Sequence, residues 1–422
     1  MSSQHSRPEL SRPAVRAAGL LLAVALLALA GCSWTSDAGA GPERSASAAR
    51  TAGSAGVTST APPTPRRWIV ALGDSYVSGE GARWAANTSG RPGPVDALGP
   101  HAYRPRGWTR STGCDRARTT VVTRVSEGLR GENLACSGAT TSSRWDGGVF
   151  TPGLDTYSDG KGHIGQLTAL RRFATHHRVT AVVVSIGGND FGFGSIIGRC
   201  TAAFLETVTN RRPSPCRTDP ALLARFAPAH VATVRRHVTA ALVGVRRALR
   251  LAGRGPSAYS VVVEGYPSPL APGPRLRYRE DLLHRLVLGG CPLFDVDATW
   301  ADRVVLPTIN AALRRAVRRS GLANVAWLDL SRAFEGHRLC EKGSAQLQET
   351  GLESWRSPGA RGRLEWVNML YIKSRPWRGQ ESLHPNYWGV LAERRCLRSA
   401  LAGPGGAARS GSCRDGRFSP TP

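Results

Sequence analysis

Lysine is scarce in this sequence: among 422 residues it occurs only at Lys161, Lys342 and Lys373, so arginine carries nearly all of the positive charge. Acidic residues are few as well, and the formal net charge is +26. Such a charge attracts polyanions, namely nucleic acid, anionic lipid or an acidic cell wall. Basic residues do not alternate with aromatic ones, so we expect no nucleic-acid groove. Stretches such as 313–319 favour solvated helix faces, and loose adhesion to an anionic envelope stays open as an alternative.

No Cys-x-x-Cys pair occurs, which argues against a structural zinc site, and we expect no metal. Of the nine cysteines, Cys32 lies at the end of an N-terminal apolar run, which leaves an even number behind it. An even count in an exported protein indicates disulfides, although eight cysteines allow 105 pairings. We expect sequential pairing, because each pair would then close a local loop. The expected pairs are Cys114 with Cys136, Cys200 with Cys216, Cys291 with Cys340, and Cys396 with Cys413.

The sequence has no apolar run that we interpret as a membrane span. The longest run, over residues 17–32, follows three arginines and has the length of a signal peptide. It ends in Leu-Ala-Gly-Cys, which resembles the lipobox of bacterial lipoproteins and predicts lipidation of Cys32. The alternative is an ordinary signal peptide that is cleaved near Ala30. We therefore expect an exported protein, either lipid-anchored at the outer face of the membrane or secreted. Residues 33–67 are small, polar and Pro-rich and predict a flexible tether.

The rest of the chain is long enough for one large domain, which we place at residues 68–404. Short apolar runs predict buried parallel strands, and amphipathic segments between them predict helices. Such alternation indicates an α/β fold, a three-layer α/β/α sandwich. No internal repeat occurs, and residues 405–422 are expected to form a tail tied by Cys413. The expected strands are 68–72, 132–136, 179–186, 259–264 and 324–330, and the expected helices are 163–177, 227–253, 302–321 and 385–401.

Four polar or glycine-rich blocks stand at the ends of predicted strands or at a helix start. In a parallel sheet, ligands bind beyond the carboxyl ends of the strands. Any one of the blocks has a plain structural explanation as a turn, but four in this order indicate a single site. The blocks are Gly73-Asp74-Ser75, then "NLACSGATT" over 133–141, "SIGGNDFGF" over 185–193, and "ESLHPN" over 381–386.

These blocks together resemble those of the GDSL esterase/lipase family, the SGNH hydrolases, and in particular its secreted bacterial branch. Ser75, Gly138, Asn189 and His384 match the four signature residues of that family. The resemblance extends from residue 68 to about residue 401 and implies a flavodoxin-like sheet of about five parallel strands. The Gly-x-Ser-x-Gly elbow of the larger α/β-hydrolase fold is absent from the sequence.

The resemblance implies a serine nucleophile, Ser75, whose proton is taken by His384. The family usually orients this histidine with an aspartate three residues earlier, where this chain has Glu381. Either Glu381 or a backbone carbonyl is expected to hold the other imidazole nitrogen. The backbone N–H groups of Ser75 and Gly138 and the side-chain amide of Asn189 would form the oxyanion hole. No cofactor is expected.

Other residues have simpler explanations. His337 is the main rival base, but it neighbours Cys340 and is expected in a loop held by a disulfide. Adjacent His176 and His177 chelate poorly and fit a solvated helix end. Asp295 and Asp297 are expected in a loop, and Asp190 is expected to support Asn189. Five aromatic residues in or near the long irregular segments are as consistent with packing as with an acyl or aryl pocket; they are Trp145, Phe150, Trp355, Trp366 and Trp377.

The sequence therefore predicts an exported, monomeric serine esterase or lipase that acts on an ester or lipid substrate. A carbohydrate esterase that removes acetyl groups from a polysaccharide would use the same chemistry. The alternative from another class is an inactive envelope-binding protein that keeps the fold and uses its arginine surface.

Overall fold

The computed structural model describes residues 66–104, 113–209, 213–371, 379–403 and 406–421. The expected signal peptide and Cys32, the linker up to residue 65, and Trp377 lie outside these residues, so the signal peptide and the lipid anchor stay predictions. No helix of the described part is long and apolar enough to cross a membrane.

A seven-stranded sheet forms the centre of the domain. Its order is β2-β1-β5-β6-β7-β8-β9, and all neighbours are parallel except β8 and β9. The first five strands follow the flavodoxin-like order, with the chain's first strand second from the edge. The strands are β1 (Arg67–Gly73), β2 (Leu129–Asn133), β5 (Arg178–Ser185), β6 (Ser260–Glu264), β7 (Val325–Arg332), β8 (Gly411–Arg414) and β9 (Arg417–Pro420); β3 (Arg144–Asp146) and β4 (Val149–Thr151) form a separate hairpin.

The α/β sandwich is confirmed, with two differences in the sheet. Strand β2 begins and ends three residues earlier than expected. The estimate of about five strands was too low, because β8 and β9 come from the residues expected to form a tail. These strands are short and partly polar, so no apolar run marks them. The Cys396–Cys413 disulfide ties β8 to the preceding helix.

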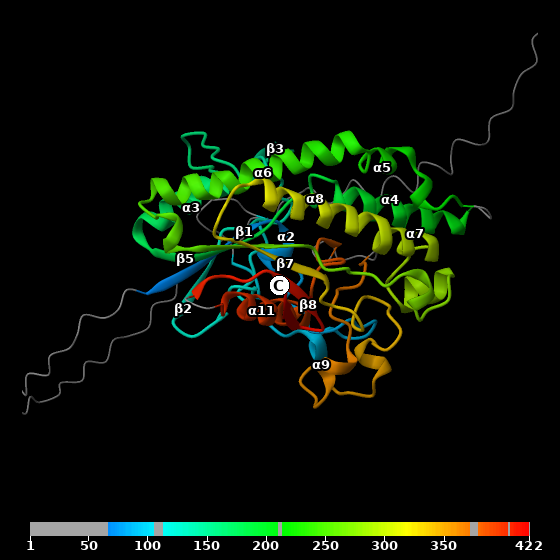
Figure 1. Cartoon of the computed structure of the whole chain (residues 1–422). Helices are drawn as coiled ribbons and strands as arrows, with labels where there is room; N and C mark the ends of the chain where they lie inside the picture. Colours follow the sequence, from blue (N-terminus) through cyan, green and yellow to red (C-terminus); the bar gives the residue numbers. More distant parts are fainter. Residues whose placement is uncertain (1–65, 105–112, 210–212, 372–378, 404–405, 422) are drawn as a thin grey trace, which may run out of the picture. The chain divides into compact units, whose positions relative to one another are not determined.

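Helices cover both faces of the sheet (Figure 1). On one face α3 and α8 flank α6, and on the other face α11 packs against β7, β8 and β9. Their inner faces are apolar because valine, leucine and alanine recur at helical spacing. The helices are α2 (Ser75–Ser78), α3 (Gln166–His176), α4 (Phe193–Leu205), α5 (Pro220–Ala224), α6 (Pro228–Leu251), α7 (Asp295–Trp300), α8 (Leu306–Arg319), α9 (Ala360–Arg363) and α11 (Tyr387–Leu401), with π-helical turns η6 (Leu282–Leu288) and η7 (Ala301–Val305).

The layer of α3, α6 and α8 carries much of the arginine and contains no aspartate or glutamate. Most of these arginines are exposed, and none forms an ion pair with a described residue. Solvated helix faces, as expected from the sequence, therefore account for most of these 11 arginines, which are about a fifth of the 56 basic residues. The arginines are Arg171, Arg172, Arg235, Arg236, Arg246, Arg247, Arg250, Arg314, Arg315, Arg318 and Arg319.

All four expected disulfides are present: Cys114–Cys136, Cys200–Cys216, Cys291–Cys340 and Cys396–Cys413. The sulfurs of Cys200 and Cys216 also lie near the carboxylate of Asp297. The two sulfurs are bonded to each other, and the carboxylate accepts the backbone N–H groups of Cys216 and Arg217 at 3.0 and 2.9 Å. Asp295 and Asp297 lie in the first turn of α7 and not in the loop that we expected.

Candidate active site

Strand β1 ends in a glycine whose position admits no side chain. Gly73 has φ +132°, and a Cβ there would lie 1.8 Å from the Ser185 carbonyl oxygen on β5. Only glycine allows this approach of β1 to β5. The side chain of Gln166 accepts the Gly73 N–H at 2.7 Å and donates to its carbonyl at 2.8 Å. The next residues turn sharply, and Asp74 caps α2 through the Tyr76 N–H at 3.2 Å. Ser75 is thereby placed at the first position of a short helix beyond the strand.

Ser75 and His384 are in direct contact, although 309 residues separate them. The Nε2 atom of His384 lies 2.7 Å from the Ser75 hydroxyl oxygen, and both side chains are buried. Desolvation lowers the pKa of His384 to about 4, against a smaller raising effect of nearby backbone carbonyls, that of Ser382 first. The imidazole is therefore neutral near pH 7 and can accept the serine proton, as a general base must.

The Glu381 carboxylate forms no hydrogen bond with the Nδ1 atom of His384. Its carboxylate accepts the Trp84 indole N–H and the Tyr103 hydroxyl, each at 2.5 Å. Within the described residues, the Nδ1 atom of His384 is buried without a hydrogen-bond partner. The backbone carbonyls of Ser382, Glu381 and Gln380, in that order, raise the pKa of His384. Of the two ways to orient His384, this arrangement favours a backbone carbonyl.

The residue before His384 has an unusual backbone. Leu383 adopts φ +60°, a left-handed conformation that costs a non-glycine residue about 1–3 kcal/mol. Its carbonyl accepts the Tyr76 hydroxyl at 3.0 Å, and its N–H donates to the Asn368 carbonyl at 3.0 Å. Surrounding contacts thus hold a strained turn that presents His384 to Ser75.

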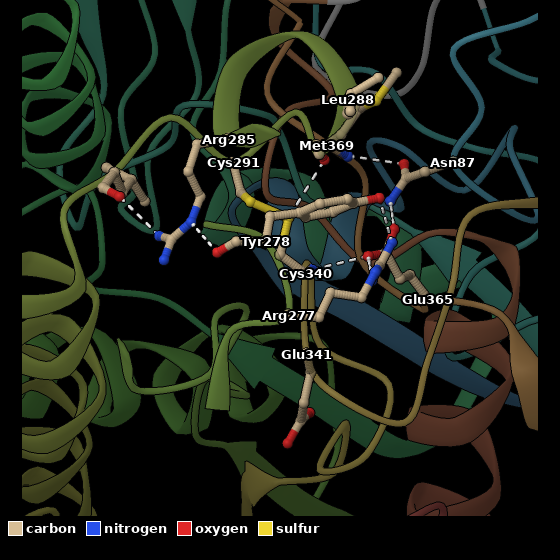
Figure 2. The surroundings of a disulfide bond; sticks show 12 residues. Asn87, Arg277, Tyr278, Arg285, Leu288, Cys291, Cys340, Glu341, Glu365 and Met369 are labelled. Atoms are coloured by element: carbon tan, nitrogen blue, oxygen red, sulfur yellow. Dashed lines mark hydrogen bonds and ion pairs between the residues drawn. A yellow bond between two sulfur atoms is a disulfide. The ribbon is translucent and has the colours of Figure 1, made fainter. Parts of the chain in front are cut away.

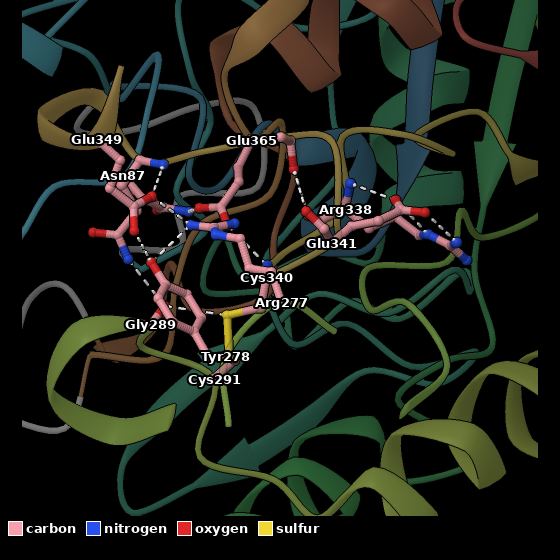
Figure 3. Close-up of polar contacts among 12 residues, drawn as sticks. Asn87, Arg277, Tyr278, Gly289, Cys291, Arg338, Cys340, Glu341, Glu349 and Glu365 are labelled. Carbon is pink, nitrogen blue, oxygen red and sulfur yellow. Dashed lines mark hydrogen bonds and ion pairs between the residues drawn. A yellow bond between two sulfur atoms is a disulfide. The ribbon is translucent and has the colours of Figure 1, made fainter. Parts of the chain in front are cut away.

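Residues 365–369 pair with the turn that carries His384, and a polar network around the Cys291–Cys340 disulfide holds them in place (Figures 2 and 3). Its centre is the buried carboxylate of Glu365, which pairs with Arg277 at 2.6 Å and accepts the Asn87 side-chain amide at 2.6 Å. The Cys340 N–H donates to the same carboxylate at 2.8 Å. Asn87 in turn accepts the Met369 N–H at 2.8 Å. Residues 365–369 are therefore fixed from both sides.

This network reaches His384 through Asn368. The backbone N–H of Asn368 donates to the His384 carbonyl at 3.0 Å, and its side chain donates to the Gly81 carbonyl at 3.0 Å. Gly81 has φ +85°, and a Cβ there would lie 2.3 Å from that side chain. Asn368 therefore bonds both the loop after Ser75 and the turn that carries His384.

Two of the three expected oxyanion residues, Gly138 and Asn189, come from loops that are hydrogen-bonded to each other. The Asn189 side-chain amide donates to the Ala139 carbonyl at 2.9 Å, which orients it and leaves its second hydrogen for a ligand. Asp190 accepts both the N–H and the hydroxyl of Thr141, the latter at 2.5 Å, so it supports these loops as expected. Gly138 has φ +71°, which favours glycine, but a Cβ there would make only an ordinary contact with Arg144.

A tyrosine that the sequence analysis did not identify links the first and third blocks. The Tyr266 hydroxyl donates to Asp74 at 2.5 Å and accepts the Gly188 N–H at 2.9 Å. Burial raises the pKa of Asp74 to about 7, against the opposing effect of the Tyr266 hydrogen bond. No motif marks Tyr266, because its role depends on β6 lying next to β5.

One open cleft of about 520 Å³ is lined by Ser75, Gly138, Asn189 and His384 together. Phe193 and Ile197 of α4 form part of its apolar wall, and they also line a separate apolar cavity of about 70 Å³. The cleft therefore combines a serine hydroxyl, a neutral imidazole and amide donors with an apolar wall. This set of groups is suited to acyl transfer.

The other described residues that the sequence raised as candidates do not line this cleft. His337 stacks on Trp366 with ring centroids 4.0 Å apart and bonds the Leu364 carbonyl at 2.9 Å. His176 is exposed at the end of α3. Among the described aromatic residues, Trp145 packs on Phe150 and Trp355 packs on Tyr387 and Trp388. None of these aromatic side chains lines the described cleft.

Comparisons with known proteins found similar structures but no sequence relatives. No family model and no curated protein matches the chain. An extracellular lipase from Streptomyces rimosus matches with 22% identity and a TM-score of 0.40, over 76% of this chain and 94% of the lipase. A phospholipase A1 from Streptomyces albidoflavus matches with 20% identity and a TM-score of 0.38, over 76% and 93%. A carbohydrate acetylesterase from Sinorhizobium meliloti matches with 14% identity and a TM-score of 0.27, over 62% and 83%.

Proposed function

We propose that this chain is a serine hydrolase of the SGNH type that cleaves carboxylic esters through an acyl-enzyme. The observation that carries the proposal is the 2.7 Å contact between the Ser75 hydroxyl and His384 Nε2 in a cleft that Gly138 and Asn189 also line. His384 takes the proton of Ser75 as the hydroxyl attacks the ester carbonyl, and then returns it to the leaving alcohol. The amide donors stabilise the charge that forms on the carbonyl oxygen.

A fluorophosphonate probe tests this proposal directly. The probe reacts with an activated serine, so it should label the wild-type chain and leave Ser75→Ala unlabelled. Labelling that survives the substitution, or its absence from the folded wild type, would refute the mechanism. Ser142→Ala is the control, because Ser142 does not line the cleft.

The apolar wall of the cleft supports esters with an apolar acyl group over an acetylated polysaccharide. Phe193 and Ile197, which also line the separate apolar cavity, would contact the acyl chain. A series of p-nitrophenyl esters of increasing acyl length separates the two candidates. We expect kcat/KM to rise from acetate to longer chains, whereas a carbohydrate acetylesterase would be most active on acetate.

Replacing Asn189 by alanine should lower kcat by about 10²–10³-fold, the usual cost of one lost oxyanion donor. The KM should change little, because the donor acts mainly on the charge of the transition state. Steady-state kinetics with p-nitrophenyl esters measures both. Thr201→Ala, a polar change on the wall of the same cleft, is the control. Equal effects of the two substitutions would argue against Asn189 as a donor.

Glu381→Gln separates the two ways of orienting His384. If the Ser382 carbonyl holds the ring, kcat should fall by less than about tenfold, because glutamine can still bond Trp84 and Tyr103. Loss of a true triad carboxylate costs about 10⁴-fold. A loss of that size in a variant with unchanged melting temperature would restore Glu381 to the triad.

The low pKa of His384 predicts an activity profile that extends into acid. The imidazole must be neutral to accept the serine proton, so kcat/KM should fall only as the pH drops through about 4. An unperturbed histidine would lose activity near pH 6.5. Brief pH-jump assays, with residual activity measured after return to pH 7, distinguish titration from unfolding. A loss of activity with its midpoint near pH 6.5 would show that His384 is more exposed to water than in the structure.

A further inference from the structure

The mechanism above leaves one buried carboxyl group of the cleft unused. Glu80 follows Ser75 by five residues, is 2% exposed, and lines the same cleft as Ser75 and His384. Its Oε2 atom lies 3.5 Å from His384 Nε2, the nitrogen that exchanges protons with Ser75. The Ser137 hydroxyl, next to Gly138, donates to the same oxygen at 2.5 Å. Glu80 therefore faces the reactive side of the imidazole, opposite Nδ1.

The second carboxyl oxygen of Glu80, Oε1, is buried and makes no hydrogen bond to a described residue. Burial raises the pKa of Glu80 well above its usual range, and the charges of Asp115, Glu381 and Asp74 raise it further, against the hydrogen bond from Ser137. Burial and these charges thus favour the neutral form of the Glu80 carboxyl group. It can accept a hydrogen bond without adding a negative charge to a site that must stabilise an oxyanion.

Hydrolysis of the acyl-enzyme requires a water oxygen next to His384 Nε2. In the second half of the reaction a water molecule must lie within hydrogen-bond distance of His384 Nε2. An atom so placed can also lie within hydrogen-bond distance of Glu80 Oε2, because that oxygen is only 3.5 Å from Nε2. Water has two hydrogens, and only one of them goes to the imidazole.

We propose that Glu80 is a catalytic residue that holds the attacking water in deacylation by accepting its second hydrogen. The first hydrogen passes to Nε2 as the water oxygen bonds to the acyl carbon, and the carbonyl electron pair moves to the oxyanion. That intermediate collapses with cleavage of the bond to Ser75 Oγ, which takes the proton back from Nε2. Acid is released, and Glu80 keeps its own proton throughout. The inference rests on the proposed acyl-enzyme.

Methanol makes the proposal testable, because it has only one hydroxyl hydrogen. It can donate that hydrogen to Nε2 and needs no second acceptor, so its attack on the acyl-enzyme does not depend on Glu80. Glu80→Met keeps an unbranched side chain but has no oxygen, whereas Glu80→Gln keeps the amide carbonyl as an acceptor. The readout is the ratio of methyl ester to free acid formed from one p-nitrophenyl ester in aqueous methanol.

For Glu80→Met we expect hydrolysis to slow about tenfold relative to methanolysis, so the product ratio rises about tenfold while the rate of the p-nitrophenol burst stays within about threefold. Glu80→Gln should keep the wild-type ratio within about twofold. An unchanged ratio in Glu80→Met, with both products reduced together, would show a purely structural role and overturn the proposal.

A second variant covers the case in which Glu80→Met does not fold. Ser137→Ala removes the hydroxyl that fixes the Glu80 carboxyl, and the product ratio should shift in the same direction by a smaller factor. An unchanged ratio in folded Ser137→Ala would then count against the proposal. Failure of the acyl-enzyme mechanism is recognised separately, since the wild type would then show neither fluorophosphonate labelling nor methyl ester formation.

Discussion

Replacing His384 by alanine should lower kcat for p-nitrophenyl esters by about 10⁴–10⁶-fold, with little change in melting temperature. The imidazole is the only base in contact with the Ser75 hydroxyl among the described residues, at 2.7 Å. Without it the hydroxyl keeps its proton and is a poor nucleophile. Stopped-flow and steady-state assays over the same ester series measure the loss in acylation.

His176→Ala is the matched control, since His176 is exposed at the end of α3, outside the cleft. Its kcat should equal that of the wild type. His337→Ala adds a second comparison, because His337 was the rival base and instead stacks on Trp366. A His384→Ala enzyme that retains more than about a tenth of wild-type activity would show that another group accepts the serine proton.

Replacing Glu365 by alanine should lower the free energy of unfolding by about 3–5 kcal/mol, the usual cost of breaking a buried charge pair. The carboxylate is fully buried and is the shared partner of Arg277, Asn87 and the Cys340 N–H (Figure 3). Its loss leaves these groups without that acceptor in the interior. Urea denaturation under non-reducing conditions measures the change, because the disulfides then stay intact.

The surface pair of Arg332 and Glu335 provides the control. The Arg332 side chain is 58% exposed, and its 2.8 Å contact with Glu335 is screened by water. Arg332→Ala should cost about 0–1 kcal/mol. Similar losses for Glu365→Ala and Arg332→Ala would show that the network around Cys291–Cys340 contributes little to stability.

The effect of Glu365→Ala on catalysis follows from its position. Glu365 lies three residues before Asn368, whose N–H bonds the His384 carbonyl. We therefore expect kcat to fall at temperatures where the variant is still folded, since His384 must stay within hydrogen-bond distance of Ser75.

Several features could be read from local sequence. The strands β1 and β5 follow from continuous apolar runs, because both faces of a central parallel strand are buried. Glycine and polar residues at the strand ends indicated one site, and the resemblance of these blocks to the GDSL family singled out four residues in it. The cleft brings these four together: Ser75, Gly138, Asn189 and His384. The disulfide pairs followed from short sequence separations of 16 to 49 residues.

Other features depend on contacts between residues far apart in the chain. Strands β8 and β9 lack an apolar run because they are short and partly polar, and β9 lies at the sheet edge. Helix α4 was not expected because it begins where a glycine-rich block ends. Glu381 has the spacing of a triad acid, but its carboxylate is bonded to Trp84 and Tyr103. Spacing along the chain places a side chain near its neighbour, whereas the direction in which it points depends on distant donors.

Residues 73–82 contain one residue that the sequence identified, Ser75, and one that only the tertiary structure did, Glu80. The sequence "GDSYVSGEGA" contains both Ser75 and this carboxyl group, and Ser75 was identified from its place among the four blocks and from the family resemblance that they carry together. The pattern assigns nothing to Glu80, because its environment comes from Ser137 and His384, which lie 57 and 304 residues further along the chain. Backbone conformation and burial follow from nearby residues, but the protonation and contacts of a buried group depend on everything that folding packs around it.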